Sequence, residues 1–156
     1  MPHPFKKSDC HVFAQPPPPP PPQAAHGVAG HSADRAALLA LPSHAGDTSA
    51  AQQLSHWSAQ AGRAGNAEQG AAFFSARHGG EWSCASCHGT PPTTQGQHAS
   101  TGKKIAPLAP AFNAKTFTDS AKVDKWFRRN CKDVLQRECS AAEKADVLAY
   151  LNRLTP

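Results

Sequence analysis

The spacing of apolar residues predicts helices, and it does so only in the part of the chain that follows residue 45. Apolar side chains recur there every three or four positions, which is the spacing of one face of a helix. We expect a first helix from the capping residues 47–49 through Gln60. A second helix should follow the cap Asn66 and run from Ala67 to about Arg77.

The second half of the domain predicts two further helices around a long loop. A third helix is expected over about residues 118–129, and a capping box formed by Ser140 and Glu143 starts a last helix over 141–154. The stretch 89–113 is rich in proline, threonine, glycine and alanine and is predicted to be an ordered loop. No segment alternates over the length of a strand. The pattern therefore predicts an all-α domain of about four helices.

The first 45 residues differ in composition from the rest. They hold a run of prolines at 16–22 and little that could pack, so we expect a disordered extension over 1–45 and one domain over 46–156. The segment 35–45 resembles the end of a secretory signal, with a basic residue, a short apolar stretch and small residues before Gly46. Three explanations stay open: a misplaced start codon, an atypical leader, or a tail without this role.

Charge limits the classes of partner. The formal net charge of +5 favours acidic protein partners or an anionic surface. The basic residues are scattered and no nucleic-acid motif accompanies them, so nucleic-acid binding is not expected. No apolar run approaches the roughly 20 residues that span a bilayer, so we expect a protein that is not integral to the membrane.

One motif indicates chemistry. Cys84 and Cys87 are separated by two residues and followed directly by His88, which is the C-x-x-C-H pattern of c-type haem attachment. In this pattern the two thiols add across the haem vinyl groups and the histidine ligates the iron. The motif predicts one covalently attached haem c.

Two other sites use the same residue types. Cys84 and Cys87 could join Cys131 and Cys139 in a four-cysteine zinc site, although seven residues between the second pair is a loose spacing. A thioredoxin-like dithiol is the other alternative, but it needs a βαβ setting that the pattern does not predict.

The surroundings of the motif resemble the order of elements in class I cytochromes c. Gly70 and an aromatic at Phe73 or Phe74 lie in a helix before the motif, and Tyr150 lies in the last helix. The resemblance implies that the first and last helices cross, with the glycine permitting a close approach. It also implies that the carbonyl of Pro107 accepts the Nδ1 proton of His88, which would orient the ring.

The second axial position lacks its usual ligand. Electron-transfer cytochromes commonly place a methionine opposite the histidine, but the only methionine here is Met1. An empty position stays open, as do the following side chains: His98, Lys103, Lys104, Asn113 and Asn130 after the motif, and His78 before it. A bis-histidine electron carrier that uses His98 or His78 is therefore the alternative function.

A second pair of cysteines lies close to one of these candidates. In an oxidising compartment such as the periplasm, where c-type haem is attached, Cys131 and Cys139 are expected to form a disulfide. Its short loop implies a stabilisation on the order of 2–3 kcal/mol. The bridge would either stiffen the backbone next to Asn130 or fasten the helix junction, and the sequence does not separate these roles.

Several motifs in order resemble the sphaeroides haem protein family, which comprises small monohaem class I cytochromes that bind oxygen and nitric oxide. The resemblance covers about residues 46–154. Its motifs are Gly46–Ser49, Cys84–His88, Thr101–Pro110, Phe117–Ser120, Val123–Cys131, Val134–Leu135, Arg137–Cys139 and Glu143–Lys144. It implies that Asn130 is the sixth iron ligand in the oxidised state and leaves on reduction.

The resemblance also implies partners and a location. We expect a monomeric periplasmic electron-transfer cytochrome whose donor is a diheme cytochrome c and whose reduced iron opens to O2 or NO. A redox activity linked to nitric oxide or oxygen is an open question. An amide is a weak, hard ligand that suits ferric iron better than ferrous iron, so release of Asn130 on reduction is chemically reasonable.

Overall fold

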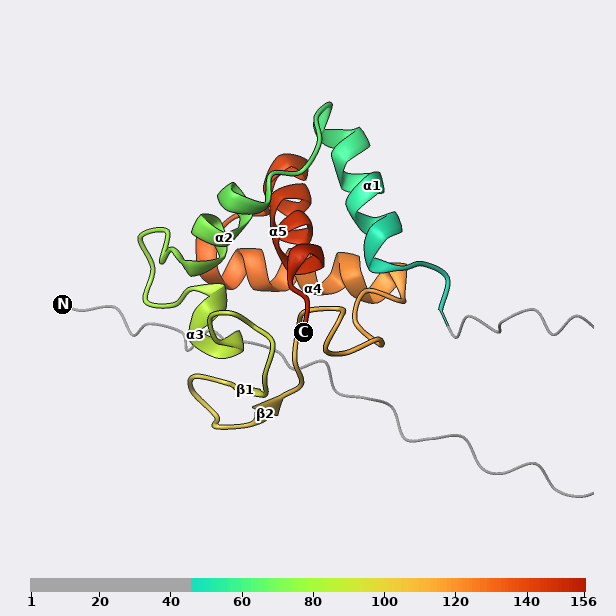
Figure 1. Ribbon diagram of the computed structural model, residues 1–156. Coiled ribbons are helices and arrows are strands. Elements are labelled where there is room, and N and C mark those ends of the chain that lie inside the picture. The colour runs from blue at the N-terminus through green and yellow to red at the C-terminus, as the bar shows by residue number, and fades with distance from the viewer. Residues whose placement is uncertain (1–45) are drawn as a thin grey trace, which may run out of the picture. The chain divides into compact units, whose positions relative to one another are not determined.

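The computed structural model describes residues 46–156, so the predicted extension over 1–45, with its signal-like segment, lies outside the described residues. The described part is mostly helical (Figure 1). Its elements in chain order are α1 Ala50–Ala61, α2 Ala67–Ser75, α3 Cys84–His88, β1 Gly96–Gln97, β2 Lys104–Ile105, α4 Ser120–Leu135 and α5 Ala141–Arg153. None of these helices is long and apolar enough to cross a membrane.

The helix starts follow from their capping side chains. Ser49 caps α1, Asn66 caps α2 and Asp119 caps α4, each by accepting backbone N–H groups of the first turn. Ser140 and Glu143 form the expected capping box at α5. The predicted helical class and these four starts are confirmed.

The last helix lies between α1 and α2 and forms the packed half of the domain (Figure 1). At the crossing of α2 and α5, Gly70 lies so close to the backbone of Asp146 that a Cβ there would overlap the Asp146 carbonyl and touch Tyr150. Phe74 packs beside this crossing, with its ring centroid 5.7 Å from that of Tyr150. The structure therefore has the crossing that the class I resemblance implied.

Helix α4 is longer than predicted. It was expected to end near Arg129 but continues to Leu135, so Asn130 and Cys131 lie inside the helix. The extension repeats the helix's inward face, since Cys131 and Val134 follow Val123 at helical spacing and are buried. Because Lys132 and Asp133 separate Cys131 from Val134, the apolar spacing was difficult to recognise in this last turn.

The loop between α3 and α4 contains a small antiparallel ladder that the sequence did not predict. Gly96 pairs with Ile105 and Gln97 with Lys104. The turn closes through a hydrogen bond from the His98 N–H to the Lys103 carbonyl at 2.8 Å. Two residues per strand are too few to give an alternating pattern, which explains why only a loop was expected.

Candidate functional site

The C-x-x-C-H motif folds as a single helical turn, α3. Its cap is Ser83, whose hydroxyl accepts the N–H of Ser86 at 3.2 Å, while the Ser86 hydroxyl accepts the N–H of Ser83 at 3.0 Å. Residues at positions i, i+3 and i+4 share one face of a helix. Cys84, Cys87 and His88 have this spacing, so all three line the same cavity.

The cavity lies between the motif and α4. Its empty volume, which includes space open to solvent, is about 920 Å³. Its wall is mainly apolar and aromatic. The apolar residues of the wall are Phe73, Phe74, Ile105, Leu108, Phe117, Val123, Trp126, Phe127, Val134, Leu135, Val147 and Leu151. Such a wall is suited to a large, flat, apolar group.

Burial keeps the groups of the motif uncharged. The pKa of His88 is lowered to about 4 because the ring is desolvated, and the pKa of the Cys84 thiol is raised to about 11 for the same reason. His88 is therefore a neutral imidazole at neutral pH, which is the form that ligates metal. The ring packs 6.2 Å from that of Phe74, measured between centroids.

Pro107, whose carbonyl was expected to accept a hydrogen bond from His88, has a different donor. The Pro107 carbonyl accepts a hydrogen bond from Asn113 Nδ2 at 3.0 Å, and the buried His88 Nδ1 has no hydrogen-bond partner. The expected hydrogen bond between His88 and Pro107 is thus not formed in this structure. A carbonyl oxygen has two lone pairs, so Pro107 can accept a second hydrogen bond beside the one from Asn113.

The far side of the motif is closed by the small ladder. Gly96 of β1 lies directly against the carbonyl of Cys87, and a Cβ at this position would overlap that oxygen and crowd the His88 Cα. The absence of a side chain lets the loop support the turn from behind. The motif is therefore held between this loop and the cavity.

Across the cavity, Asn130 contributes the only amide side chain of the wall. It forms no side-chain hydrogen bond within residues 46–156. The same face of α4 presents Trp126 and Phe127 to the cavity. The spacing of these two aromatics alone would fit a packed core as well as a cavity wall.

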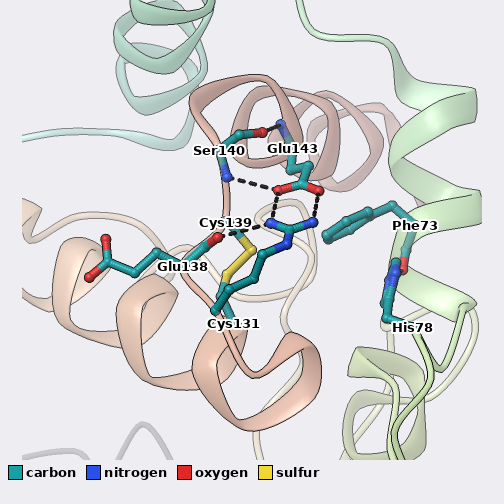
Figure 2. Close-up of a disulfide and its surroundings, with 8 residues drawn as sticks. Phe73, His78, Cys131, Glu138, Cys139, Ser140 and Glu143 are labelled. Atoms are coloured by element: carbon teal, nitrogen blue, oxygen red, sulfur yellow. Dashed lines mark hydrogen bonds and ion pairs between the residues drawn. A yellow bond between two sulfur atoms is a disulfide. The ribbon is translucent and has the colours of Figure 1, made fainter.

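Figure 2 shows a disulfide between Cys131 and Cys139, whose Cα atoms are 5.5 Å apart. It joins the end of α4 to the residue before the cap of α5, and both cysteines line the cavity. The turn between them is held by Arg137, which donates to both carboxylate oxygens of Glu143 at 2.8 and 2.6 Å. This ion pair and a hydrogen bond from the Ser140 N–H hold the pKa of Glu143 at about 2.

Both histidines of the bis-histidine alternative lie outside the cavity wall. His98 is buried in the ladder turn, where its Nδ1 accepts the N–H of Thr101 at 3.1 Å. His78 is exposed and its Nε2 donates to the Phe73 carbonyl at 2.8 Å, with the two rings packed together (Figure 2). The geometry does not support either as a distal ligand.

The zinc and dithiol alternatives also lose their basis. The disulfide removes Cys131 and Cys139 from any four-cysteine site, and residues 46–156 contain no group of three or more metal-binding side chains. Cys84 and Cys87 are not joined by a disulfide and lie on a helical turn, in a domain whose described strands have only two residues each.

The comparisons with known proteins agree with this geometry. The chain matches a family described as a domain of unknown function, DUF1924, over residues 60–151. It is 50% identical to cytochrome c-type protein SHP of Cereibacter sphaeroides over 119 residues, which cover 74% of this chain and 92% of that protein.

Two solved structures are similar as well. Oxidised SHP, described as an oxygen-binding cytochrome c, matches with a TM-score of 0.64 and 48% identity, covering 68% of this chain and 97% of the other. The solution structure of cytochrome c'' from Methylophilus methylotrophus, a protein studied for haem-ligand detachment, matches with a TM-score of 0.61 and 37% identity. It covers 69% of this chain and 94% of that one.

Fold and cavity together define a monohaem c-type cytochrome with one covalently bound haem c. The chain belongs to the DUF1924 family and, with SHP, to the sphaeroides haem proteins. The resemblance that the sequence motifs indicated is thereby confirmed.

Proposed function

We propose that this cytochrome binds a diatomic ligand, O2 or NO, at the side of the haem that faces α4, and that Asn130 controls access to it. The observation that supports this most is that Asn130 lines the same cavity as Cys84, Cys87 and His88. The oxygen binding named for SHP supports the same conclusion.

Each residue has a distinct role in this proposal. Cys84 and Cys87 would hold the haem through thioether bonds, and His88 would ligate the iron as a neutral imidazole. When bound, the haem would supply an iron that exchanges one electron and binds a small ligand. Asn130 would offer its amide to the oxidised iron and release it on reduction. The apolar wall would keep water from the position that Asn130 leaves.

The domain boundaries and location follow the sequence. We place the haem domain at residues 46–156 behind an extension at 1–45, in a monomeric periplasmic protein, because c-type haem is attached there and the disulfide requires an oxidising compartment. Its electron donor is a redox protein, for which the family resemblance suggests a diheme cytochrome c.

Spectroscopy of the haem-loaded protein tests the role of Asn130. Asn130→Ala should give a ferric spectrum without the amide-ligated, low-spin form, and its dithionite-reduced form should bind carbon monoxide as wild type does. The matched control is Asn152→Ala, which removes an amide that donates to the Ala50 carbonyl at 3.1 Å, away from the cavity. A ferric spectrum unchanged by Asn130→Ala would remove this residue from its role.

The wild-type protein tests the function itself. Its reduced form should change its absorption spectrum on addition of carbon monoxide or nitric oxide. A reduced six-coordinate spectrum that ignores both gases would overturn the ligand-binding proposal and leave an electron carrier.

A further inference from the structure

Helix α4 presents two opposite faces of different chemistry. The inward face lines the haem cavity with Val123, Phe127, Asn130 and Val134, which follow one another at helical spacing. With 3.6 residues per turn, positions centred half a turn away face outward. Four cations occupy that outward side, namely Lys125, Arg128, Arg129 and Lys132. We call these four residues the basic stripe.

No residue of the basic stripe forms an ion pair within the described part of the protein. The ion pairs of residues 46–156 join Arg63 to Asp146, Lys122 to Asp119, and Arg137 to Glu143, so none of them uses a stripe residue. Three of the four stripe side chains are exposed and Arg129 is half-buried. The whole of α4 contains five basic and two acidic residues, a formal charge of +3.

This arrangement costs stability in the isolated protein. The stripe has the spacing i, i+3, i+4, i+7, so each cation has like-charged neighbours one turn away, and such pairs destabilise a helix. A helix face that needed only solubility would mix both signs of charge. The repulsion would be relieved by an acidic surface placed against the stripe.

The stripe is also next to the cavity wall. The Lys125 ammonium lies 5.6 Å from the centroid of the Trp126 ring, and Trp126 lines the cavity. A partner seated on the stripe would be separated from the haem by one helix, about 10–12 Å in diameter. That position suits a donor of electrons more than a partner with a purely structural role.

We propose that the basic stripe is the docking surface for an acidic one-electron donor protein. The reduced donor loses one electron and the ferric iron gains it, so that no other group changes. The proposal rests on the proposed function, because reduction is the event that releases Asn130. It adds the place where the donor binds and the charge that the donor's surface must have.

The test uses the haem-loaded protein and a reduced acidic flavodoxin as the donor. The triple variant Lys125→Glu, Arg128→Glu, Lys132→Glu reverses the stripe. The matched control Lys103→Glu, Lys104→Glu, Lys115→Glu reverses three exposed lysines elsewhere and gives the same net charge. Stopped-flow reduction should be at least about 10-fold slower for the stripe variant at low salt, and the difference should shrink at high salt.

A second measurement does not depend on electron transfer. Titration of oxidised flavodoxin into the oxidised protein should shift amide resonances of α4 in wild type and in the control variant, but not in the stripe variant. Unchanged dithionite-reduced spectra in both variants would show that the haem site is intact.

Other outcomes would overturn the proposal. Equal slowing of both variants would mean that only net charge matters. A stripe variant that reacts with flavodoxin like wild type but no longer binds phosphatidylglycerol vesicles would assign the stripe to a membrane surface. If the stripe results hold while Asn130→Ala leaves the ferric spectrum unchanged, the docking surface stands and only the ligand-binding role falls.

Discussion

The two sides of this domain bury apolar residues for different purposes. On one side, α5 packs between α1 and α2, where Ala145 and Leu148 are inaccessible to solvent. On the other side, α4 turns its apolar face to the cavity. The first side is stabilised by contacts between its own residues, whereas the stability of the second depends on the haem that fills its cavity. Three variants would test this contrast, and two of them act on one side only.

The largest effect is expected from removing the attachment cysteines. Cys84→Ala with Cys87→Ala should abolish covalent haem completely, because the other described cysteines, Cys131 and Cys139, form a disulfide. The cavity would then lack its main apolar contact, so amides of α4 should exchange with deuterium much faster than those of α5. Haem retention after acid–acetone extraction and hydrogen exchange measure both effects.

The control for this variant removes the other cysteine pair. Cys131→Ser with Cys139→Ser should retain covalently bound haem, because these residues form the disulfide and not the motif. Equal exchange rates in α4 and α5 without haem would contradict the division into two sides.

A smaller but still large effect is expected on the packed side. Gly70→Val places atoms where the Asp146 carbonyl lies, so α2 and α5 must separate. The free energy of unfolding should fall by more than about 3 kcal/mol. Chemical denaturation of the haem-loaded protein measures it. Ala72→Val, at an exposed position of the same helix, should cost only about 0.5 kcal/mol.

The smallest effect concerns the turn that links the two sides. The folded pKa of Glu143 is lowered to about 2, so its stabilising contribution is present above the ordinary carboxyl pKa and is lost as pH falls toward 2. Because Arg137 is half exposed, we expect about 1 kcal/mol or less. The loss of stability between pH 6 and pH 2.5 should be smaller in Glu143→Gln than in wild type by this amount, because Asp119 and Asp146, whose pKa values are also lowered, keep their contributions.

An exposed glutamate of α2 provides the comparison for this pH effect. Glu68→Gln should keep the wild-type loss, since Glu68 forms no ion pair within residues 46–156. A Glu143→Gln variant with the full wild-type pH dependence would assign the acid sensitivity to another carboxylate.

Local chemistry in the sequence was enough to predict much of this molecule. Ser49, Asn66 and Ser140 mark helix starts because a capping side chain acts on backbone groups only two or three residues away. The haem motif is equally local, since Cys84, Cys87 and His88 occupy a single turn. Such features need no knowledge of distant contacts.

The rest was decided by tertiary structure, for physical reasons that no local pattern contains. The length of α4 depends on burying Cys131 and Val134 against distant parts of the chain, and the ladder at β1 depends on a pairing across a loop. Apolar spacing shows that Trp126 and Phe127 turn inward, but a core and a cavity wall have the same spacing. Only the three-dimensional arrangement shows that they line the same cavity as His88.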